Sequence, residues 1–516
     1  MRSSGIRLTP DSETIPINSL PAQLLAAVVA GCIGVFGFGP FDYFWAALVS
    51  AAAVTWLWWD AAPRRAAWLG FAYGAGLFGA GVSWVYVSMH VYGHMSPWMA
   101  ILAVMVFVAI LSLYPALVGW IYRGILARHR VAGTVVGLPA LWALGEWVRS
   151  WAFTGFPWLS LGYSQVDSWL RGWSPVLGIY GVSWLTMLTA VLLVWIGKYR
   201  DRRRWYAASA AAIMWLAGLV LGQVMWTNPV GKPVKVALVQ GNVSLEEKWA
   251  ADRRPAIMKR YLVLSNHLED RDLIVWPEAA LPYFIDEVDD RVWRSMRQHP
   301  ADFILGVLER ESDGHELHVF NSVVAITHGA PQVYRKAHLV PFGEYLPLRP
   351  LFGWVIDYLH IPMSDFSAWP GPDQGPLKAG GTLVGVTICY EDAFPEDLMK
   401  SLPAAEILAN VSEDAWFGLS LAPGQRIQMA RMRAIETQRP MLRAANTGVS
   451  AIIDDEGTIT ARSRQFVEAV VKGSVQPRKG STPFIFWGNR GIVSLAGLLL
   501  LLAVVVNIRS RETQPR

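Results

Sequence analysis

The stretch TLVGVTICYEDAFP, residues 382–395, joins an apolar run to a short acidic segment. The run is rich in β-branched residues, which favours a buried strand. Cys389 stands at the end of this run and is one of only two cysteines in 516 residues. Because free cysteine is among the most buried residue types, two interpretations are open: a structural thiol in a core, or a nucleophile at a strand end.

Other apolar runs of strand length occur between residues 232 and 478. They are VKVALVQ (234–240), DLIVWP (272–277), DFILGVL (302–308) and SVVAIT (322–327). Helix-like stretches alternate with them, such as residues 253–268 and 423–438. This alternation predicts an α/β domain whose sheets are covered by helices, and its length is sufficient for a core of its own.

The chain as a whole is too apolar for an ordinary soluble protein. Hydrophobic residues make up 53% of the whole, charged residues only 16%, and the mean hydropathy is +0.31, which is typical of a multi-span membrane protein. Eight apolar segments approach the ~20 residues that cross a bilayer core. They are residues 20–38, 43–60, 66–89, 97–122, 132–150, 174–197, 205–226 and 489–508.

We therefore predict five parts. Residues 1–19 form a cytoplasmic segment, residues 20–228 a membrane domain of seven transmembrane helices, and residues 232–478 the α/β domain. The last transmembrane helix spans residues 489–508, and a cytoplasmic tail spans residues 509–516. The fifth apolar segment carries Glu146 and Arg149 near its end, so its crossing is the least supported.

The basic residues predict the orientation of the chain. The net charge of +5 does not indicate a nucleic-acid partner, because the charges gather at the ends of alternate apolar segments. They are Arg64, Arg65, Arg123, Arg128, Arg130, Lys198, Arg200, Arg202, Arg203, Arg204, Arg509 and Arg511. Since positive loops face the cytoplasm, both termini are expected there and the domain of residues 232–478 on the outer side of the membrane.

The second cysteine, Cys32, ends a VAGC stretch that looks like a lipoprotein-processing site. Because the apolar run continues past Cys32 and more apolar segments follow, we favour a small-residue face on a packed helix. A disulfide between Cys32 and Cys389 would join bilayer depth to an aqueous domain, so both are predicted to be free thiols.

Three stretches of the α/β region place a reactive side chain at or just beyond the end of an apolar run. They are IVWPEAALP with Glu278, YRKAHLVPFGEYLP with Lys336, and CYEDAFP with Cys389. Strand ends are where distant side chains converge in α/β sheets. A carboxylate shielded from water is able to deprotonate cysteine, and a lysine stabilises the thiolate and an acyl oxyanion. Singly, each residue has a structural alternative: a turn glutamate, a solvated lysine or a core cysteine.

Together, the three stretches resemble the three catalytic boxes of the nitrilase superfamily, in the order Glu, Lys, Cys. LVQGNV (238–243), NVSEDAWFG (410–418) and the long stretch 428–454 extend the match. They resemble the apolipoprotein N-acyltransferase family, which is the integral membrane branch of that superfamily. The resemblance covers nearly the whole chain and implies an αββα sandwich on the periplasmic side of a bacterial inner membrane.

The resemblance also implies a reaction with two acyl transfers. Cys389 would attack the sn-1 ester of a membrane phospholipid such as phosphatidylethanolamine and form a thioester. The α-amine of the S-diacylglyceryl cysteine of an apolipoprotein would then accept the acyl group, as the last step of lipoprotein maturation. Glu278 would be the general base and Lys336 the oxyanion stabiliser. No cofactor or metal is implied, and a monomer is expected.

Further residues match family positions. Glu344 would orient Lys336, and Tyr390 and Glu391 would support the nucleophile. Trp249, in the EEKW stretch, resembles a family tryptophan at the entrance, although an aromatic residue at a membrane interface also serves as an anchor. We expect a further set to shape the floor of the pocket. This set consists of Asn410 and the DAWFG run with Trp416.

Two apolar stretches are expected near the site. LRPLFGWVIDYLHIPM (348–363) is predicted to be a lid or lipid-contacting arm, with a buried helix as its alternative. FPWLSLGYS (156–164), between two spans, is expected to face the same cavity.

Two other functions remain open. A membrane-bound nitrilase-type amidase or hydrolase would use the same acyl-enzyme, with water as acceptor. A non-enzymatic scaffold or transporter would use the fold for binding alone. The many apolar segments favour a lipid substrate over the first, and the intact Glu, Lys and Cys set argues against the second.

Overall fold

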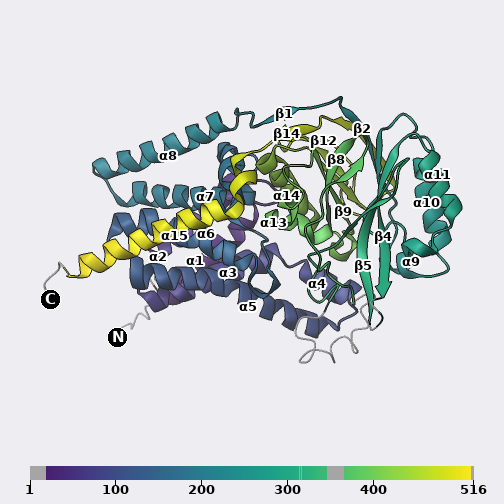
Figure 1. Cartoon of the computed structure of the whole chain (residues 1–516). Coiled ribbons are helices and arrows are strands. Elements are labelled where there is room, and N and C mark those ends of the chain that lie inside the picture. The colour runs from purple at the N-terminus through teal and green to yellow at the C-terminus, as the bar shows by residue number, and fades with distance from the viewer. Residues whose placement is uncertain (1–18, 313, 315, 346–364, 513–516) are drawn as a thin grey trace, which may run out of the picture.

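The computed structural model describes residues 19–312, 314, 316–345 and 365–512. Within them, the chain forms a bundle of apolar helices with an α/β domain at one end (Figure 1). The bundle comes from residues before 222 and after 482, and the α/β domain comes from residues between them. The predicted combination of a helical region with an α/β domain is confirmed.

Eight long helices make up the bundle in the described part of the chain. They are α1 (Leu20–Val35), α2 (Phe44–Trp58), α3 (Pro63–Gly81), α5 (Pro97–Ile121), α6 (Leu138–Arg149), α7 (Ser174–Lys198), α8 (Arg202–Leu221) and α15 (Pro483–Glu512), and α4 (Val85–Val87) is a single short turn. Side-chain caps set some of their starts: Ser19 accepts from the N–H of Ala22, and Asp201 from that of Arg203. The third helix ends at Gly81, earlier than the predicted residue 89.

Among the described residues, five helical stretches are long and apolar enough to cross a membrane. They are Pro97–Leu126, Val131–Arg149, Trp169–Lys198, Arg202–Leu221 and Pro483–Ser510. The apolar helices α1 and α2 have 16 and 15 residues, which reach at most about 24 Å against a core of about 30 Å. The predicted eight crossings are thus supported for five stretches, and the full number stays a prediction.

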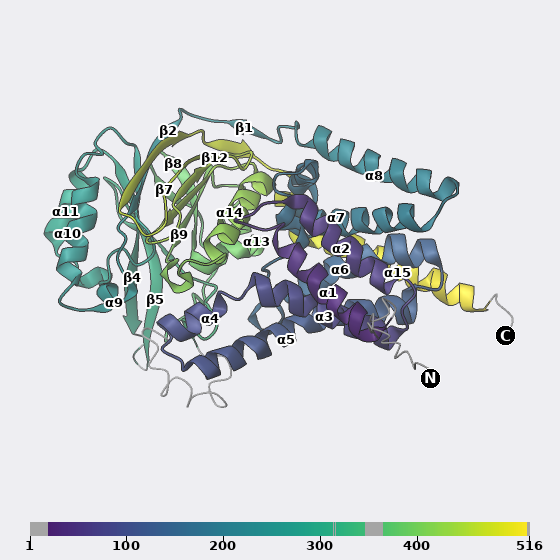
Figure 2. The same cartoon turned by 180° about the vertical axis from the view of Figure 1, so that it is seen from behind.

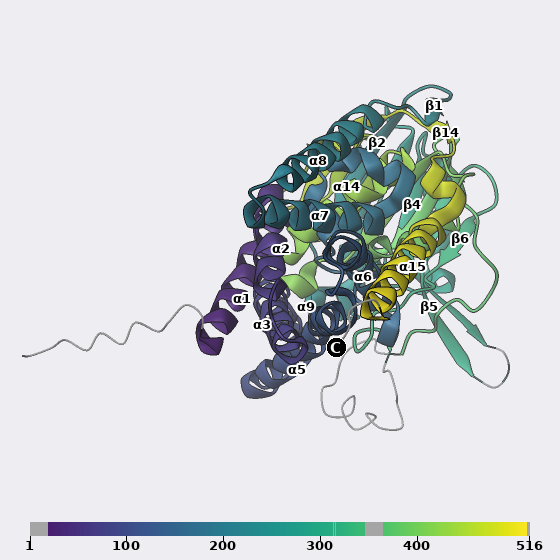
Figure 3. The same ribbon diagram turned by 90° about the vertical axis from the view of Figure 1, so that its left-hand side faces the viewer.

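The helices differ in how far they are enclosed. In the view of Figure 3, α6 and α7 lie inside the bundle and α5, α8 and α15 at its periphery. In the stretch that contains α7, 78% of the most apolar 18 residues are buried inside the structure. The corresponding share is 22% for the stretch with α5, 17% for α8 and 22% for the stretch with α15. Apolar side chains that face outward along peripheral helices are suited to contact with lipid.

Close backbone contact joins α1 to α3. A Cβ on Gly31 would lie 2.2 Å from the carbonyl oxygen of Tyr73, and one on Gly76 would lie 2.1 Å from that of Val28. The Sγ of Cys32 donates to the Gly76 carbonyl at 3.5 Å. The VAGC stretch therefore forms a small-residue packing face, as we favoured.

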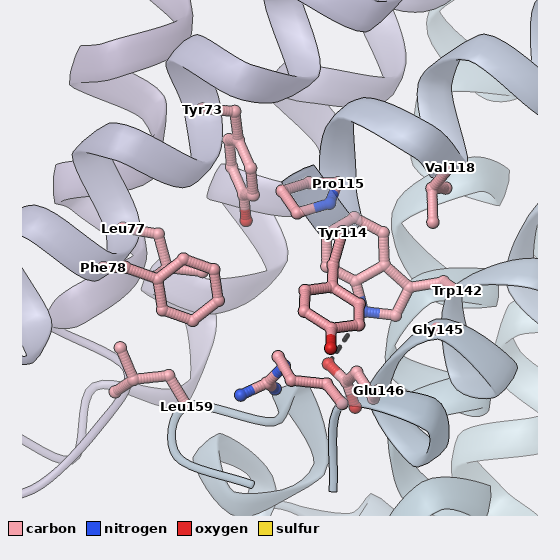
Figure 4. Close-up of a pocket in the computed structure, with 11 residues that line it drawn as sticks. Tyr73, Leu77, Phe78, Tyr114, Pro115, Val118, Trp142, Gly145, Glu146 and Leu159 are labelled. Carbon is pink, nitrogen blue, oxygen red and sulfur yellow. Dashed lines mark hydrogen bonds between the residues drawn. The ribbon is translucent and has the colours of Figure 1, made fainter. Parts of the chain in front are cut away.

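Two charged residues of the fifth apolar segment are buried in the bundle. Oε1 of Glu146 accepts from Trp142 at 2.8 Å (Figure 4), and Arg149 donates to the carbonyl of Trp158 at 2.5 Å. The pair therefore binds its own chain instead of facing lipid. Tyr114 lines a cavity of about 20 Å³ beside them, which holds about one water and is too small for an acyl chain.

The α/β domain contains two six-stranded sheets. One has the order β13-β2-β3-β4-β5-β6 and the other β12-β11-β10-β9-β8-β7. The first comprises β2 (Val234–Gln240), β3 (Leu273–Val275), β4 (Asp302–Ser312), β5 (Leu317–Ile326), β6 (Gln332–Arg335) and β13 (Ala469–Val475). The second comprises β7 (Leu377–Ala379), β8 (Thr382–Ile388), β9 (Ile407–Ser412), β10 (Met441–Ala445), β11 (Ala451–Ile453) and β12 (Ile459–Arg462).

The sheets pack face to face between two layers of helices. Leu238 and Ile304 from the first sheet share a core with Val386 and Leu442 from the second. Helices α10 (Arg254–Ser265) and α11 (Asp290–Gln298) cover the outer face of the first sheet, and α13 (Pro395–Met399) and α14 (Ala422–Thr437) that of the second. This is the expected αββα sandwich.

The sandwich meets the bundle through α13 and α14, which lie between the sheets and the bundle helices (Figures 1 and 2). The two chain connections run side by side, because β1 (Thr227–Pro229) pairs antiparallel with β14 (Arg478–Gly480). The chain therefore enters and leaves the sandwich at the same place.

Candidate active site

The three predicted reactive residues follow three strand ends. Glu278 lies in the turn after β3, Lys336 comes directly after β6, and Cys389 directly after β8. Nζ of Lys336 is 3.7 Å from Oε1 of Glu278, and the charges of both act on the thiol of Cys389. The structure thus brings together residues from the two facing sheets, as the positions of these residues predicted.

Glu278 is held by both of its carboxylate oxygens. Oε1 accepts from the amide of Asn321 at 2.7 Å, and Oε2 accepts from the backbone N–H of Glu413 at 2.8 Å. The turn itself lies against β4, where a Cβ on Gly306 would be 2.7 Å from the Cα of Glu278 and 2.4 Å from the nitrogen of Ala279. Only glycine permits so close an approach of the two backbones.

Lys336 is fully buried and paired with carboxylates. Its Nζ lies 2.8 Å from Oε1 and 2.7 Å from Oε2 of Glu344. Burial alone would lower the pKa of Lys336, but the Glu344 and Glu278 carboxylates reverse this and raise it above the ordinary value. The lysine is therefore a fixed positive charge in contact with Glu344, and the orienting role of Glu344 stays a prediction.

Cys389 has an unusual backbone conformation and a thiol that resists deprotonation. Its φ is +49°, a left-handed conformation that residues other than glycine rarely adopt. Burial raises the pKa of the thiol to about 12; the Glu278 carboxylate adds to the rise, and the charges of Arg426 and Lys336 oppose it. A thiol in this state attacks only when a base takes its proton at the moment of reaction.

Glu391 joins the segment after Lys336 to the segment around Cys389. Its Oε1 accepts from the N–H groups of Ala337 and His338 at 2.8 and 3.1 Å. Its Oε2 accepts from the N–H of Ile388 at 2.7 Å and from the hydroxyl of Tyr334 at 3.0 Å. Burial raises the pKa of this carboxyl to about 7, and Asp397 adds to that rise. These bonds give the predicted positioning role a geometric basis.

Tyr390 connects the site to the bundle. Its hydroxyl donates to the carbonyl of Gly155 at 2.8 Å, and its ring stacks on Trp158 with centroids 5.7 Å apart. Both partners lie in the connection between α6 and α7. The stretch 156–164 therefore does contact the residue beside the predicted nucleophile.

A buried charge network beneath Cys389 was not predicted from the sequence. Arg426 and Arg443 each pair with both Asp392 and Asp414, at distances of 2.7–3.0 Å. The predicted pocket residue Asn410 joins this network: it accepts from Arg443 at 2.7 Å and donates to the Cys389 carbonyl at 3.1 Å. Asp392, Asp414 and Arg443 lie within the quoted family motifs and Arg426 lies just before one of them, but only packing reveals their pairing.

The two predicted tryptophans occupy different places. Trp416 is half-buried: its ring lies 6.1 Å from that of Tyr92, and its carbonyl accepts from Ser88 in the bundle. Trp249 ends α9 (Leu245–Trp249) and is half-buried. Its neighbour Lys248, which sequence reasoning missed, is buried, donates to the Glu278 carbonyl at 3.1 Å and pairs with Glu413. The predicted lid at 348–363 lies outside the described residues.

Two family models match the chain. Residues 30–192 match the apolipoprotein N-acyltransferase N-terminal domain, and residues 235–482 match the carbon-nitrogen hydrolase family. The first match covers most of the bundle, and the second covers the sandwich with all three predicted reactive residues.

Curated relatives match over nearly the full length. An apolipoprotein N-acyltransferase from Nitrosomonas europaea is 44% identical over 95% of this chain and 98% of its own length. Another, from Methylococcus capsulatus, is 41% identical over 92% and 95%. A carbon-nitrogen hydrolase structure from Helicobacter pylori G27 covers 52% of this chain and 94% of its own, at 15% identity and a TM-score of 0.35, which is too low to bear on the fold.

Proposed function

The chain belongs to the apolipoprotein N-acyltransferase family, and we propose that it moves a fatty acyl chain from a membrane phospholipid to the amine of an apolipoprotein. The donor is the sn-1 chain of a phosphatidylethanolamine-like lipid, and the acceptor is the α-amine of an S-diacylglyceryl cysteine. The observation that carries this proposal is the meeting of Glu278, Lys336 and Cys389 between the two sheets.

In the first transfer, Glu278 takes the thiol proton as the sulfur of Cys389 attacks the ester carbon. A C–S bond forms, and the carbonyl oxygen becomes an oxyanion that the ammonium of Lys336 stabilises. Collapse of this intermediate breaks the ester C–O bond. The departing lysophospholipid oxygen takes the proton from Glu278, and a thioester remains on Cys389.

In the second transfer, the neutral amine of the apolipoprotein attacks the thioester carbon. Glu278 takes the proton that the amine loses, and the oxyanion again faces Lys336. The C–S bond then breaks, an amide is released, and the proton returns from Glu278 to the sulfur. The enzyme ends in its starting state, so the two transfers form a ping-pong cycle.

The surroundings favour a lipid donor over a soluble amide. Phe153 is 91% exposed and lies two residues before Gly155, which binds Tyr390. Phe342, between Lys336 and Glu344 in sequence, is 49% exposed. Exposed apolar side chains on segments that reach the site are suited to a membrane surface.

The loops at the opposite end of the bundle support the proposed orientation. Asp60, after α2, pairs with Arg130 at 2.8 Å and with Lys198 at 3.8 Å, and Arg123 donates to the carbonyl of Ala61 at 2.6 Å. The basic connections thus gather at one end, away from the sandwich (Figure 1). By the positive-inside rule, this gathering supports the proposal that the sandwich lies on the periplasmic side of the inner membrane.

Transfer and hydrolysis are separable with one labelled donor. The purified full chain is given phosphatidylethanolamine with a labelled sn-1 chain and an S-diacylglyceryl cysteine peptide. We expect label on the peptide as a hydroxylamine-resistant amide. The same peptide with an acetylated amine is the control and should stay unlabelled. Release of labelled free fatty acid at the same rate with either peptide would instead identify a hydrolase.

A further inference from the structure

Arg426 contacts the sulfur of Cys389. It lies on α14, is 1% exposed, and its Nη1 lies 3.3 Å from Sγ of Cys389, while Nη2 donates to the carbonyl of the same residue at 2.6 Å. We propose that Arg426 is a second cationic catalytic residue, which stabilises the sulfur of Cys389 whenever that sulfur carries negative charge. This inference rests on the proposed function, because it concerns the same covalent step.

The two cations have different partners. The ammonium of Lys336 is bound to Glu344 at 2.7 Å and lies beside Glu278, whereas Nη1 of Arg426 donates both to Asp414 at 2.9 Å and to the sulfur at 3.3 Å. Among the residues that the structure describes, Arg426 is the cation that donates an N–H group to the sulfur. We therefore assign the oxyanion to Lys336 and the thiolate to Arg426, since a charge-assisted hydrogen bond stabilises the group it points at.

Several other charged groups surround the sulfur, and any change in the pKa of its thiol reflects all of them. Glu278 and Asp414 raise the pKa of the thiol, and Arg426 and Lys336 lower it. The groups that face Cys389 or pair directly with those that do are Glu278, Lys336, Glu344, Asp392, Asp414, Arg426 and Arg443. Because Arg426, Arg443, Asp392 and Asp414 balance in charge, the effect of Arg426 comes from its closeness to the sulfur.

The thiolate appears twice in the cycle, and this gives Arg426 two moments of action. Negative charge first develops on the sulfur as Glu278 takes the thiol proton and the sulfur bonds to the acyl carbon. It forms again when the amine has attacked, the C–S bond breaks and the electron pair returns to the sulfur. A donor on the sulfur makes it a better leaving group in that second step.

The symmetry of the network offers a matched pair of variants. Arg426→Met with Asp414→Asn leaves the Asp392–Arg443 pair intact, and Arg443→Met with Asp414→Asn leaves the Asp392–Arg426 pair intact. Each double variant removes one positive and one negative charge from the same buried cluster. Only the first removes the N–H donor to the sulfur.

Alkylation by iodoacetamide measures the thiolate without any substrate. The full chain in detergent, in a Cys32→Ser background, is treated between pH 7 and 10, and intact mass gives the rate at Cys389. We expect the Arg426→Met/Asp414→Asn variant to react about tenfold more slowly at each pH than the Arg443→Met/Asp414→Asn variant, which equals a thiol pKa about one unit higher. Equal rates for the two variants at every pH would overturn the proposal.

A single variant covers the case in which a double variant does not fold. Arg426→Gln keeps an N–H donor for the carboxylates but removes the charge, and should slow alkylation at pH 8 severalfold relative to the parent. A rate within twofold of the parent would contradict the role. Because iodoacetamide reports on the sulfur alone, these results stand even if no acyl group is ever found on Cys389, which would count against the proposed function only.

Discussion

At the scale of single residues, the most constrained residue of the candidate site is Cys389, whose backbone and side chain are both held by neighbours. Its carbonyl is held by Asn410 and Arg426, and its thiol is surrounded by buried charge. A strained, fully supported residue is suited to a nucleophile that must stay aimed. The same burial raises the pKa of the thiol, which is why the proposed mechanism has the Glu278 carboxylate take its proton.

Replacing the base tests this dependence. Glu278→Gln keeps the shape of the side chain but cannot take a proton, so acylation of Cys389 should slow by about 10²–10⁴-fold. The rate is measured as acyl mass gained after addition of phospholipid. Glu309→Gln is the matched control: Glu309 is a partly buried carboxylate of the same sheet that pairs with Arg335 instead of the site. Acylation at the normal rate in the Glu278→Gln variant would show that Glu278 is not the general base.

The resting thiol also predicts a pH profile. A thiol with a pKa of about 12 is protonated at neutral pH, and its thiolate fraction rises tenfold with each pH unit up to that value. Alkylation of the substrate-free chain should therefore still be rising at pH 10. An ordinary thiol, with a pKa near 8.5, levels off above about pH 9. A plateau reached by pH 10 would show that the pKa of the Cys389 thiol is not raised in this way.

Which site residues were predictable depends on whether a local pattern marks them. Glu278 and Cys389 follow apolar runs, and the resemblance of three stretches to the nitrilase boxes singled out both of them together with Lys336. Arg426 sits inside a helix whose sequence gives no sign of its partner, and its contact with Cys389 exists only because α14 packs on the second sheet. Lys248 was missed for the same reason.

At the scale of elements, the close approach of β4 to the Glu278 turn constrains the site. Gly306→Ala would push a methyl group against the backbone of Glu278 and Ala279. We expect it to lower acylation at least tenfold and the free energy of unfolding by about 1–3 kcal/mol. Thermal unfolding and acyl mass measure the two effects. Gly375→Ala, at an exposed position with no atom near its Cβ, should change neither; wild-type activity in the Gly306 variant would contradict the contact.

Several elements were predictable and others were not. The apolar runs predicted β2, β3, β4, β5 and β8, because burial dictates the composition of these strands. The short β6, with the sequence QVYR, carries no apolar run and was not predicted, although it positions Lys336. The end of α3 at Gly81 was not predicted either, because the sequence stays apolar through the turn that follows the helix.

At the scale of the whole molecule, an apolar bundle and a sandwich are joined so that the site lies at their boundary. The contact between Tyr390 and the α6–α7 connection is part of that boundary. The order of apolar segments made the two-part architecture predictable. How closely the sandwich sits on the bundle was not, because it depends on side chains from both parts.

The orientation is testable by labelling single cysteines. In a Cys32→Ser/Cys389→Ser background, Val263→Cys lies on α10, where the side chain is 61% exposed. It should react with a membrane-impermeant maleimide on intact spheroplasts. Asp201→Cys, in the exposed connection between α7 and α8, should react only after the membrane is opened. Labelling of the two positions in the opposite order would reverse the proposed topology.

The most direct test of the central claim is the intact mass of the full chain, purified from membranes and supplied with phospholipid. We predict an added fatty acyl mass that hydroxylamine removes, as it removes a thioester, and that is absent from Cys389→Ser as a hydroxylamine-labile adduct. A folded chain that gains no acyl mass, or gains one at a site other than Cys389, would contradict the covalent mechanism.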